Sequence, residues 1–359
     1  MRNLSGLTSI RFFAALWVVL YHLAPNWDLL RNVGPIVYVG YSAVTLFFVL
    51  SGFILSYNYL SSDYRPQEFW VARAARVLPV YFAALIVSIP VFLHQCLKQG
   101  IPFVPAAFYP VVMVQAWIPK VALLWNGPGW SLSCEAFFYL LFPLILAPMA
   151  RLFRRTFAGT FAAVWILGIV PSLIYAFVRP EGLVDFESHA TLLSVIKFNP
   201  ILRLPEFILG IGIGACYVDG KRFSNPVATA VLSVIGLVVL IVSLWKMPYP
   251  SLHNALLVPV YAVLIFALAC APNILSNPML VLLGQASYSL YLLSDPTYSW
   301  ATFLAKRYGL SVHGSFNIVY LIIILLVSVA SYKFIEVPGR VYIRSRFAVK
   351  KRRPFSVAV

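Results

Sequence analysis

The stretch Arg11-Phe-Phe-Ala-Ala-Leu-Trp-Val-Val-Leu-Tyr-His22 decides the fold, because every residue between its ends is apolar or aromatic. Such a run predicts a helix buried in lipid or in a protein core. Eleven helical steps close nearly whole turns, so Arg11 and His22 share one face, about 16 Å apart along the axis. In a hydrocarbon core about 30 Å thick, Arg11 near one surface places His22 near the midplane. Ionisable residues at such depth are costly and indicate function.

The composition extends this interpretation to the whole chain of 359 residues. It is 61% hydrophobic and 11% charged, with a mean hydropathy of +0.87. These values exclude a soluble globular domain and predict an all-α, polytopic integral membrane protein. The first apolar run lacks a small-residue cleavage site and leads into further spans, so we expect a retained helix and not a signal peptide. We expect one membrane domain, residues 1–345, followed by a basic cytoplasmic tail, residues 346–359.

The net charge of +16 would suit a nucleic-acid partner, but the placement of the basic residues predicts a membrane topology instead. They form short clusters between apolar runs, as the positive-inside rule predicts for cytoplasmic loops. These clusters lie at Arg65 to Arg76, at Arg151 to Arg155, at Lys221–Arg222 and in the tail. We therefore expect membrane lipids and no nucleic acid as partners.

Ten apolar runs predict ten transmembrane helices, with both termini cytoplasmic. They are residues 9–24, 36–60, 77–95, 133–150, 157–178, 198–217, 225–245, 255–271, 281–300 and 317–335. An eleventh run, 103–117, is short and interrupted by Pro105 and Pro110. A crossing there would place every later basic cluster on the wrong side, so we expect a re-entrant segment or one that lies in the interface.

His22 is the first candidate for chemistry inside these spans, because a neutral imidazole is a natural general base for a hydroxyl nucleophile. A lone histidine on a soluble helix is more often a core residue, but burial in lipid favours function. Glu135 is the second candidate, in Trp130-Ser-Leu-Ser-Cys-Glu135 at the start of the fourth span. Helix capping and interfacial aromatic residues explain that stretch as well as a functional acid does.

Other polar residues lie inside the predicted spans. Arg203 and Glu206 lie three apart on one helix face, where an internal ion pair is favoured. Asp295 precedes Pro296 at a predicted break in the ninth span. The four cysteines have no metal-ligand spacing, so we expect small core residues and no metal.

Arg73 and Arg76 lie three apart on a segment that is predicted to be helical and cytoplasmic. Two arginines on one face suit the recognition of phosphate groups. Anionic lipid head groups explain the pair equally well, and on sequence grounds alone they are the favoured interpretation.

Together these motifs resemble the family-3 membrane acyltransferases, bacterial O-acyltransferases that modify surface polysaccharides and other exported acceptors. Motifs similar to those of the family follow in order along nearly the whole chain: Leu7-Thr-Ser-Ile-Arg11 through His22, Phe47-Phe-Val-Leu-Ser-Gly-Phe53, Arg73-x-x-Arg76 with Pro79 and Tyr81, Trp130-Ser-Leu-Ser-x-Glu135, and Gly284 through Ser287-Tyr-Ser-Leu-Tyr-Leu-Leu293 with Pro296. One departure is Ser294, where family members commonly have histidine. A role of that histidine would be altered here or moved to Asp295.

The resemblance implies an O-acetyltransferase of the bacterial plasma (inner) membrane, without the periplasmic hydrolase-like domain of some relatives. It would move an acyl group, acetyl by default, from cytoplasmic acyl-CoA to a hydroxyl of an exported or lipid-linked glycan such as O-antigen or exopolysaccharide. Acetyl-CoA would be a co-substrate, and no bound cofactor is expected. Arg11, Arg73 and Arg76 would bind the donor phosphates. Expected acceptor-binding or supporting residues are Trp130, Ser133, Arg203, Glu206, Tyr288, Ser294 and Asp295.

The implied mechanism uses His22 as the base that deprotonates the acceptor hydroxyl, with Glu135 orienting it or compensating its charge. The developing oxyanion requires a cation or a backbone donor. Direct transfer is favoured over an acyl-enzyme, because no serine or cysteine has the context of a nucleophile. Two alternatives use the same residues differently. A transporter or flippase of a lipid-linked sugar would need the intramembrane charges as a substrate path, and a scaffold subunit would need them for stability.

Overall fold

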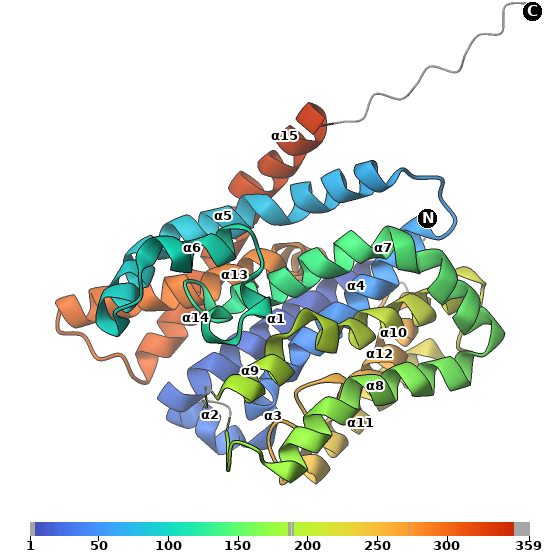
Figure 1. Ribbon diagram of the computed structural model, residues 1–359, viewed down its shortest axis with the longest axis horizontal. Helices are drawn as coiled ribbons and strands as arrows, with labels where there is room; N and C mark the ends of the chain where they lie inside the picture. The colour runs from blue at the N-terminus through green and yellow to red at the C-terminus, as the bar shows by residue number, and fades with distance from the viewer. Residues whose placement is uncertain (1–3, 186–187, 189, 272, 348–359) are drawn as a thin grey trace, which may run out of the picture.

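The computed structural model describes residues 4–185, 188, 190–271 and 273–347. These residues form a bundle of helices without a strand, which confirms the predicted all-α class (Figure 1). In chain order the α-helices are α1 (Ser5–Leu23), α2 (Asp28–Val33), α3 (Pro35–Tyr38), α4 (Ala43–Tyr59), α5 (Pro66–Gln99), α6 (Phe103–Val111), α7 (Trp130–Arg155), α8 (Phe157–Val178), α9 (Thr191–Phe198), α10 (Pro200–Val218), α11 (Pro226–Leu244), α12 (Val258–Cys270), α13 (Pro278–Arg307), α14 (Ser315–Ser331) and α15 (Val337–Phe347). The predicted tail begins inside α15, and its residues 348–359 lie outside the described part.

Eight of the ten predicted spans coincide with helices of the described chain that are long and apolar enough to cross a membrane. The other two are α12, which is shorter, and α13, which is long but more polar. The polarity of α13 has a structural cause, because seven of its residues between Gln285 and Tyr298 line cavities inside the bundle. The count of ten crossings therefore stays a prediction for these two helices.

The segment 103–117 contains no helix long enough to cross. Helix α6 has nine residues, which is about 14 Å, less than half of a hydrocarbon core. Side chains satisfy carbonyl groups on both sides of the irregular backbone after α6. The Tyr81 hydroxyl of α5 donates to the Pro110 carbonyl near the end of α6 (2.7 Å), and the Gln115 amide donates to the Gly129 carbonyl just before α7 (2.8 Å). Satisfied polar groups are what non-helical backbone needs at membrane depth.

Helix α4 forms the centre of the bundle and α11 its periphery, since 78% of the apolar stretch of α4 is buried in protein against 17% for α11. Glycines allow the central helices to touch. A Cβ atom on Gly52 of α4 would lie 2.1 Å from the Phe207 carbonyl oxygen of α10, and one on Gly284 of α13 would lie 2.1 Å from the Thr8 carbonyl oxygen of α1. Small residues at such crossings let backbones approach closely in membrane bundles.

Proline does not break α13, contrary to the predicted break at Asp295-Pro296. The helix continues through Pro296, which has no N–H for the Leu292 carbonyl one turn earlier. The Asn126 side-chain amide donates to that carbonyl instead, at 3.1 Å. Because the orphaned carbonyl is satisfied from outside, the helix remains continuous and presents Asp295 on its surface.

Candidate functional site

Two adjoining cavities lie inside the bundle. The first, which we call the basic cavity, has a volume of about 360 Å³ and is lined by Arg11, Arg73, Arg76, Glu135, Tyr288 and Arg340, among others. The second, the histidine cavity, has a volume of about 410 Å³ and is lined by His22, Trp130, Lys197, His253, Ser294 and Asp295, among others. Val44 of α4 and Tyr291 of α13 line both cavities, so the cavities meet at these two side chains.

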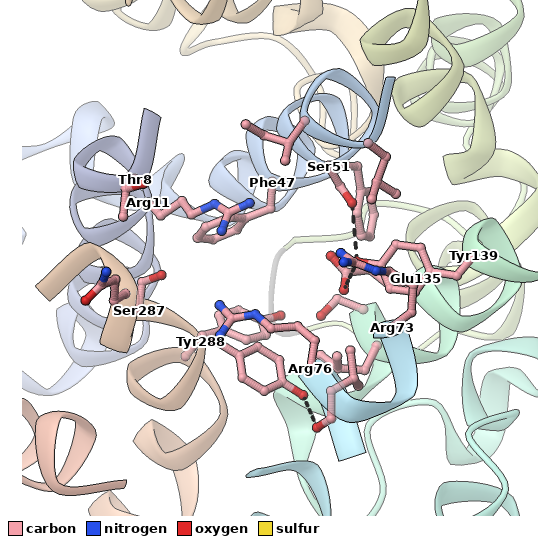
Figure 2. A pocket seen from close by; sticks show the side chains of 18 of the residues that line it. Thr8, Arg11, Phe47, Ser51, Arg73, Arg76, Glu135, Tyr139, Ser287 and Tyr288 are labelled. Atoms are coloured by element: carbon pink, nitrogen blue, oxygen red, sulfur yellow. Dashed lines mark hydrogen bonds between the residues drawn. The ribbon is translucent and has the colours of Figure 1, made fainter. Parts of the chain in front are cut away.

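The basic cavity gathers arginines from separate helices. Figure 2 shows Arg11 of α1 facing Arg73 and Arg76 of α5 across the cavity. Arg73 and Arg76 lie on one face of α5 because they are three residues apart. The structure thus brings together the three arginines predicted to bind the donor. Arginine forks match phosphate oxygens in geometry and in charge.

Glu135 is held in this cavity by its own helix. Tyr139, one turn later on α7, donates to a Glu135 carboxylate oxygen at 2.8 Å, and the Ser51 hydroxyl of α4 lies 3.3 Å from the Tyr139 hydroxyl (Figure 2). The predicted pairing of Glu135 with His22 is not found, because the two residues line different cavities. Both residues belong to predicted transmembrane helices, but the rotation of α7 about its axis points Glu135 toward the arginines of the basic cavity.

A second carboxylate links the arginines of α5 to α15. Glu336 is fully buried and forms ion pairs with Arg76 and with Arg340. The Arg76 guanidinium also lies over the ring of Tyr288, 5.5 Å from its centroid, and the Tyr288 hydroxyl donates to the Val77 carbonyl (2.8 Å). Arg76 is therefore fixed in position before any ligand binds.

The histidine cavity receives His22 from α1. Its imidazole is exposed and lines the cavity. A neutral imidazole has one nitrogen without a proton, and that nitrogen can accept a proton or a hydrogen bond. Aromatic rings form much of the remaining wall, including Tyr41, Trp130 and Tyr320. The cavity thus combines a base with surfaces suited to an amphipathic ligand.

His253 is a second histidine in the same cavity, and sequence reasoning missed it. It lies in the loop that precedes α12, with its ring stacked on Tyr41 (centroids 5.1 Å apart, planes at 13°). Burial lowers the pKa of His253 well below its usual range, and the charges of Arg203 and Lys197 lower it further. The imidazole is therefore neutral near pH 7.

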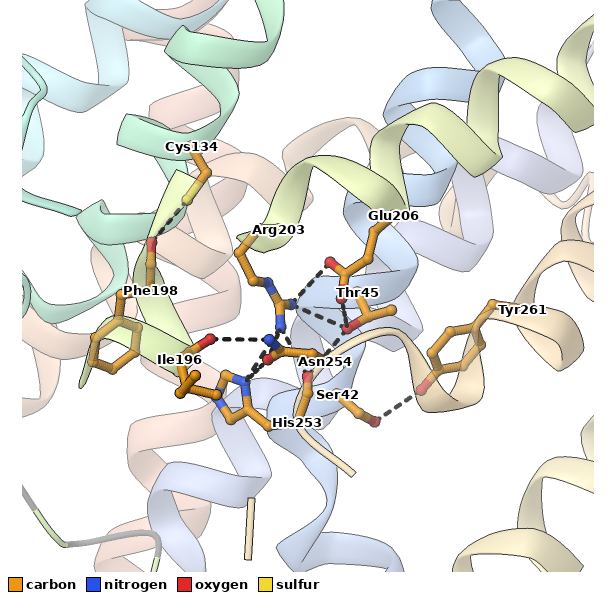
Figure 3. A network of polar contacts seen from close by, with 10 residues as sticks. All are labelled: Ser42, Thr45, Cys134, Ile196, Phe198, Arg203, Glu206, His253, Asn254 and Tyr261. Atoms are coloured by element: carbon orange, nitrogen blue, oxygen red, sulfur yellow. Dashed lines mark hydrogen bonds and ion pairs between the residues drawn. The ribbon is translucent and has the colours of Figure 1, made fainter. Parts of the chain in front are cut away.

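Hydrogen bonds fix the tautomer of His253 (Figure 3). The Asn254 amide donates to the Ile196 carbonyl (2.9 Å), so its oxygen is free to accept. Arg203 Nη1 donates one hydrogen bond to the His253 carbonyl (2.9 Å) and one to that Asn254 oxygen (2.7 Å), so both of its protons are engaged. His253 Nδ1, 3.0 Å from the same oxygen, must then carry the ring proton. Nε2 is left as an acceptor that no described residue bonds.

The predicted ion pair of Arg203 with Glu206 is present, with Nη2 and Oε2 3.1 Å apart and both side chains fully buried. Thr45 of α4 completes it by donating to Glu206 (3.1 Å) and accepting from Arg203 (3.1 Å) (Figure 3). The pair lines neither cavity. It instead ties α4 and α10 to the loop that holds His253.

Of the other predicted residues, three line the histidine cavity, one lines the basic cavity, and one lines neither. Trp130, Ser294 and Asp295 line the histidine cavity, and Asp295 accepts from the Gly127 backbone N–H at 3.4 Å. Tyr288 lines the basic cavity. Ser133 lines neither cavity and instead accepts from the Ala116 N–H (3.4 Å), which packs the segment after α6 against α7. Among the described residues no three His, Cys, Asp or Glu side chains form a group able to hold a metal ion.

Comparison with known proteins identifies the family to which the chain belongs. The model of a protein family described as an acyltransferase domain, Acyl_transf_3, matches residues 4–333. The chain belongs to the family-3 membrane acyltransferases. It is 30% identical to "Acyltransferase MdmB" of Streptomyces mycarofaciens over 86% of this chain and 80% of that protein. It is 26% identical to "O-acetyltransferase OatA" of Staphylococcus aureus over 94% of this chain. No solved structure gave a significant match.

Membership of the family-3 acyltransferases makes this chain a membrane-embedded O-acyltransferase. The match to OatA covers only 57% of the length of that protein. The family match contains α1 with Arg11 and His22, and it ends four residues before α15 begins at Val337. Both cavities are therefore part of the family domain, whereas the α15 wall of the basic cavity lies beyond it.

Proposed function

We propose that this O-acyltransferase moves an acyl group, acetyl by default, from cytoplasmic acyl-CoA in the basic cavity to a hydroxyl of an exported or lipid-linked glycan in the histidine cavity. The observation that carries the proposal is the meeting of the two cavities at Val44 and Tyr291. In this proposal a donor bound among the arginines extends its thioester past Val44 and Tyr291 toward His22. The positive-inside rule orients the arginines toward the cytoplasm of a bacterial inner membrane.

The basic cavity suits the charged end of acyl-CoA. Five arginines line it, namely Arg11, Arg73, Arg76, Arg340 and Arg344, and the carboxylates of Glu135 and Glu336 offset part of their charge. This excess of positive charge favours a ligand with several phosphate groups. The pantetheine arm of CoA is long, thin and uncharged, so it can pass Arg11 along α1 while the nucleotide stays among the arginines.

The chemistry follows from the free nitrogen of His22. This nitrogen takes the proton of the acceptor hydroxyl as the hydroxyl oxygen forms a bond to the thioester carbonyl carbon. The tetrahedral intermediate then collapses, the C–S bond breaks, and the CoA thiolate leaves and takes the proton from the imidazolium. The products are an acyl ester and free CoA, and His22 returns to its neutral form. No acyl-enzyme is required.

The histidine cavity suits a sugar hydroxyl as the acceptor. Its aromatic rings offer faces on which the apolar side of a sugar ring stacks. Asp295 and His253 Nε2 offer acceptors for other hydroxyl groups of the same ligand. Sites that orient a small ligand are usually lined by many apolar groups and a few polar ones, and the histidine cavity has this composition.

The proposed function is tested with membranes that contain the protein and its native glycans. Radiolabelled acetyl-CoA should yield labelled glycan and an equal amount of free CoA, and mass spectrometry of the glycan should show one added acyl mass per modified sugar. A transporter or flippase would move glycan without releasing CoA. Absence of CoA release in membranes with folded protein would contradict the proposal.

A further inference from the structure

Helix α15 forms one wall of the basic cavity and lies beyond the residues that the family model matches. Its sequence, Val-Pro-Gly-Arg-Val-Tyr-Ile-Arg-Ser-Arg-Phe, contains three arginines and no acid. Figure 1 shows it projecting from the bundle beside α5. Arg340 and Arg344 lie one turn apart on this helix, and both line the basic cavity.

The contact between α15 and α5 is close and specific. A Cβ atom on Gly339 would lie 2.6 Å from Cβ of Pro79, so the two helices can touch here only because residue 339 has no side chain. Pro79 lies three residues after Arg76 on α5. The glycine therefore places the start of α15 directly against the arginine-bearing turn of α5.

A buried carboxylate fixes the register of this contact. A π-helical turn, Tyr332–Glu336, precedes α15, and such turns occur frequently at functional sites. Glu336, at its end, is fully buried and pairs with Arg76 and with Arg340 (2.5 Å). It holds the guanidinium groups of two helices together, which without it would repel one another.

The arginines of α15 retain unused binding capacity. Arg340 Nε and Arg73 Nε are buried and have no hydrogen-bond partner, and neither does the second oxygen of Glu336. The side chain of Arg340 is 30% exposed and Arg344 is exposed, so the two lead outward from the buried pair to the cavity mouth. Buried donors without partners in a cavity of excess positive charge indicate an anionic ligand.

We propose that Arg340 and Arg344 bind the outermost phosphate of the donor, the 3′-phosphate of the CoA ribose, while α5 meets the diphosphate. The assignment rests on the proposed function and on the order of groups along the donor. With the thioester directed toward His22, the diphosphate comes next and the phosphorylated ribose lies farthest out, where α15 forms the wall. The phosphate of an anionic lipid has the same chemistry, so the test separates the two sources.

The test measures binding of two probes, acetyl-CoA and its 3′-dephospho form, to the full chain in nanodiscs of uncharged phosphatidylcholine. Isothermal titration should show about tenfold tighter binding of acetyl-CoA, the size expected for one charged hydrogen-bonded contact. Arg340→Gln with Arg344→Gln should remove this preference and leave the affinity for the dephospho form within about twofold. Arg76 still pairs with Glu336 in that variant, so the fold should persist, as thermal unfolding checks.

Two further variants sharpen the result. Arg346→Gln is the matched control, because Arg346 is on the same helix but does not line the cavity, and it should keep the full preference. Gly339→Val should push α15 away from Pro79 and reduce the preference without removing a charge. Equal weakening toward both probes, or none, in the double variant would overturn the assignment of the 3′-phosphate.

Lipid and donor sources are separated by repeating the titrations with half of the phosphatidylcholine replaced by anionic phosphatidylglycerol. A preference for the 3′-phosphate that is present in both lipids supports the donor assignment. An effect of the double variant confined to anionic nanodiscs would overturn it in favour of a lipid head group. If the wild-type protein binds neither probe, the proposed function itself fails, whereas binding without preference removes only the role of α15.

Discussion

Arg11 and His22 lie on one helix, eleven residues apart, and line two different cavities that meet at Val44 and Tyr291. Helix α1 therefore connects the basic cavity with the histidine cavity. An O-acyltransferase that takes its donor from one side of a membrane and its acceptor from the other needs such a connection.

Arg73→Gln should weaken donor binding. The guanidinium of Arg73 lines the basic cavity, whereas Arg65 at the start of α5 is exposed and does not. Loss of a charged contact to phosphate should raise the KM for acetyl-CoA about tenfold. Arg65→Gln is the matched control, with an unchanged KM. Steady-state CoA release measures both, and equal effects of the two substitutions would contradict the placement of the donor.

Glu135→Gln should affect the donor and not the base. Glu135 lies among the arginines and accepts from Tyr139, a bond that a glutamine oxygen can keep. We expect a changed KM for acetyl-CoA, and a pH dependence of kcat that stays as in the wild type. A shift of that pH profile would show that Glu135 acts on His22 after all.

Arg203→Leu should destabilise the fold. The substitution leaves Glu206 buried without its partner, which costs about 3–5 kcal/mol in comparable buried pairs. Arg203→Leu combined with Glu206→Leu should cost less than the sum of the single substitutions, because no charge is then left unpaired. Thermal unfolding in detergent measures the difference. Additive losses would show that the two side chains do not act as a pair.

His253 should make the protein less stable in acid. Its pKa is lowered in the folded state, so the unfolded chain binds a proton first as pH falls below about 6.5, and the unfolding free energy then declines. The His253→Gln variant should show a smaller decline between pH 7 and pH 5. Melting temperatures across that range give the comparison. Parallel curves for wild type and variant would contradict a buried, neutral His253.

The sequence was sufficient for most of the spans and for the residues that carry charge into the membrane. Eight of the ten predicted spans coincide with long apolar helices, because lipid allows few other structures, and 103–117 was predicted to be no ordinary span. Arg11, Arg73 and Arg76 were predicted as one set, and they line one cavity. Helical periodicity and the placement of charges were enough to group these three arginines.

Contacts between distant segments were not predictable in the same way. Asn126 satisfies the Leu292 carbonyl from 166 residues away, so the effect of Pro296 could not be predicted from its own surroundings. His253 lies in a loop without a motif, and its tautomer depends on Arg203, fifty residues earlier. The rotation of α7 decides which cavity Glu135 lines, and this rotation cannot be predicted from the residue pattern of α7 alone.

The most direct measurement is acyl transfer by His22→Gln. The substitution keeps a polar side chain on α1 but removes the base. Transfer of label from radiolabelled acetyl-CoA to membrane glycan should fall about a hundredfold or more, the usual contribution of a general base. Acetyl-CoA should still bind with wild-type affinity, because Arg11, Arg73 and Arg76 are untouched. Transfer near the wild-type rate by the folded variant would contradict the central role of His22.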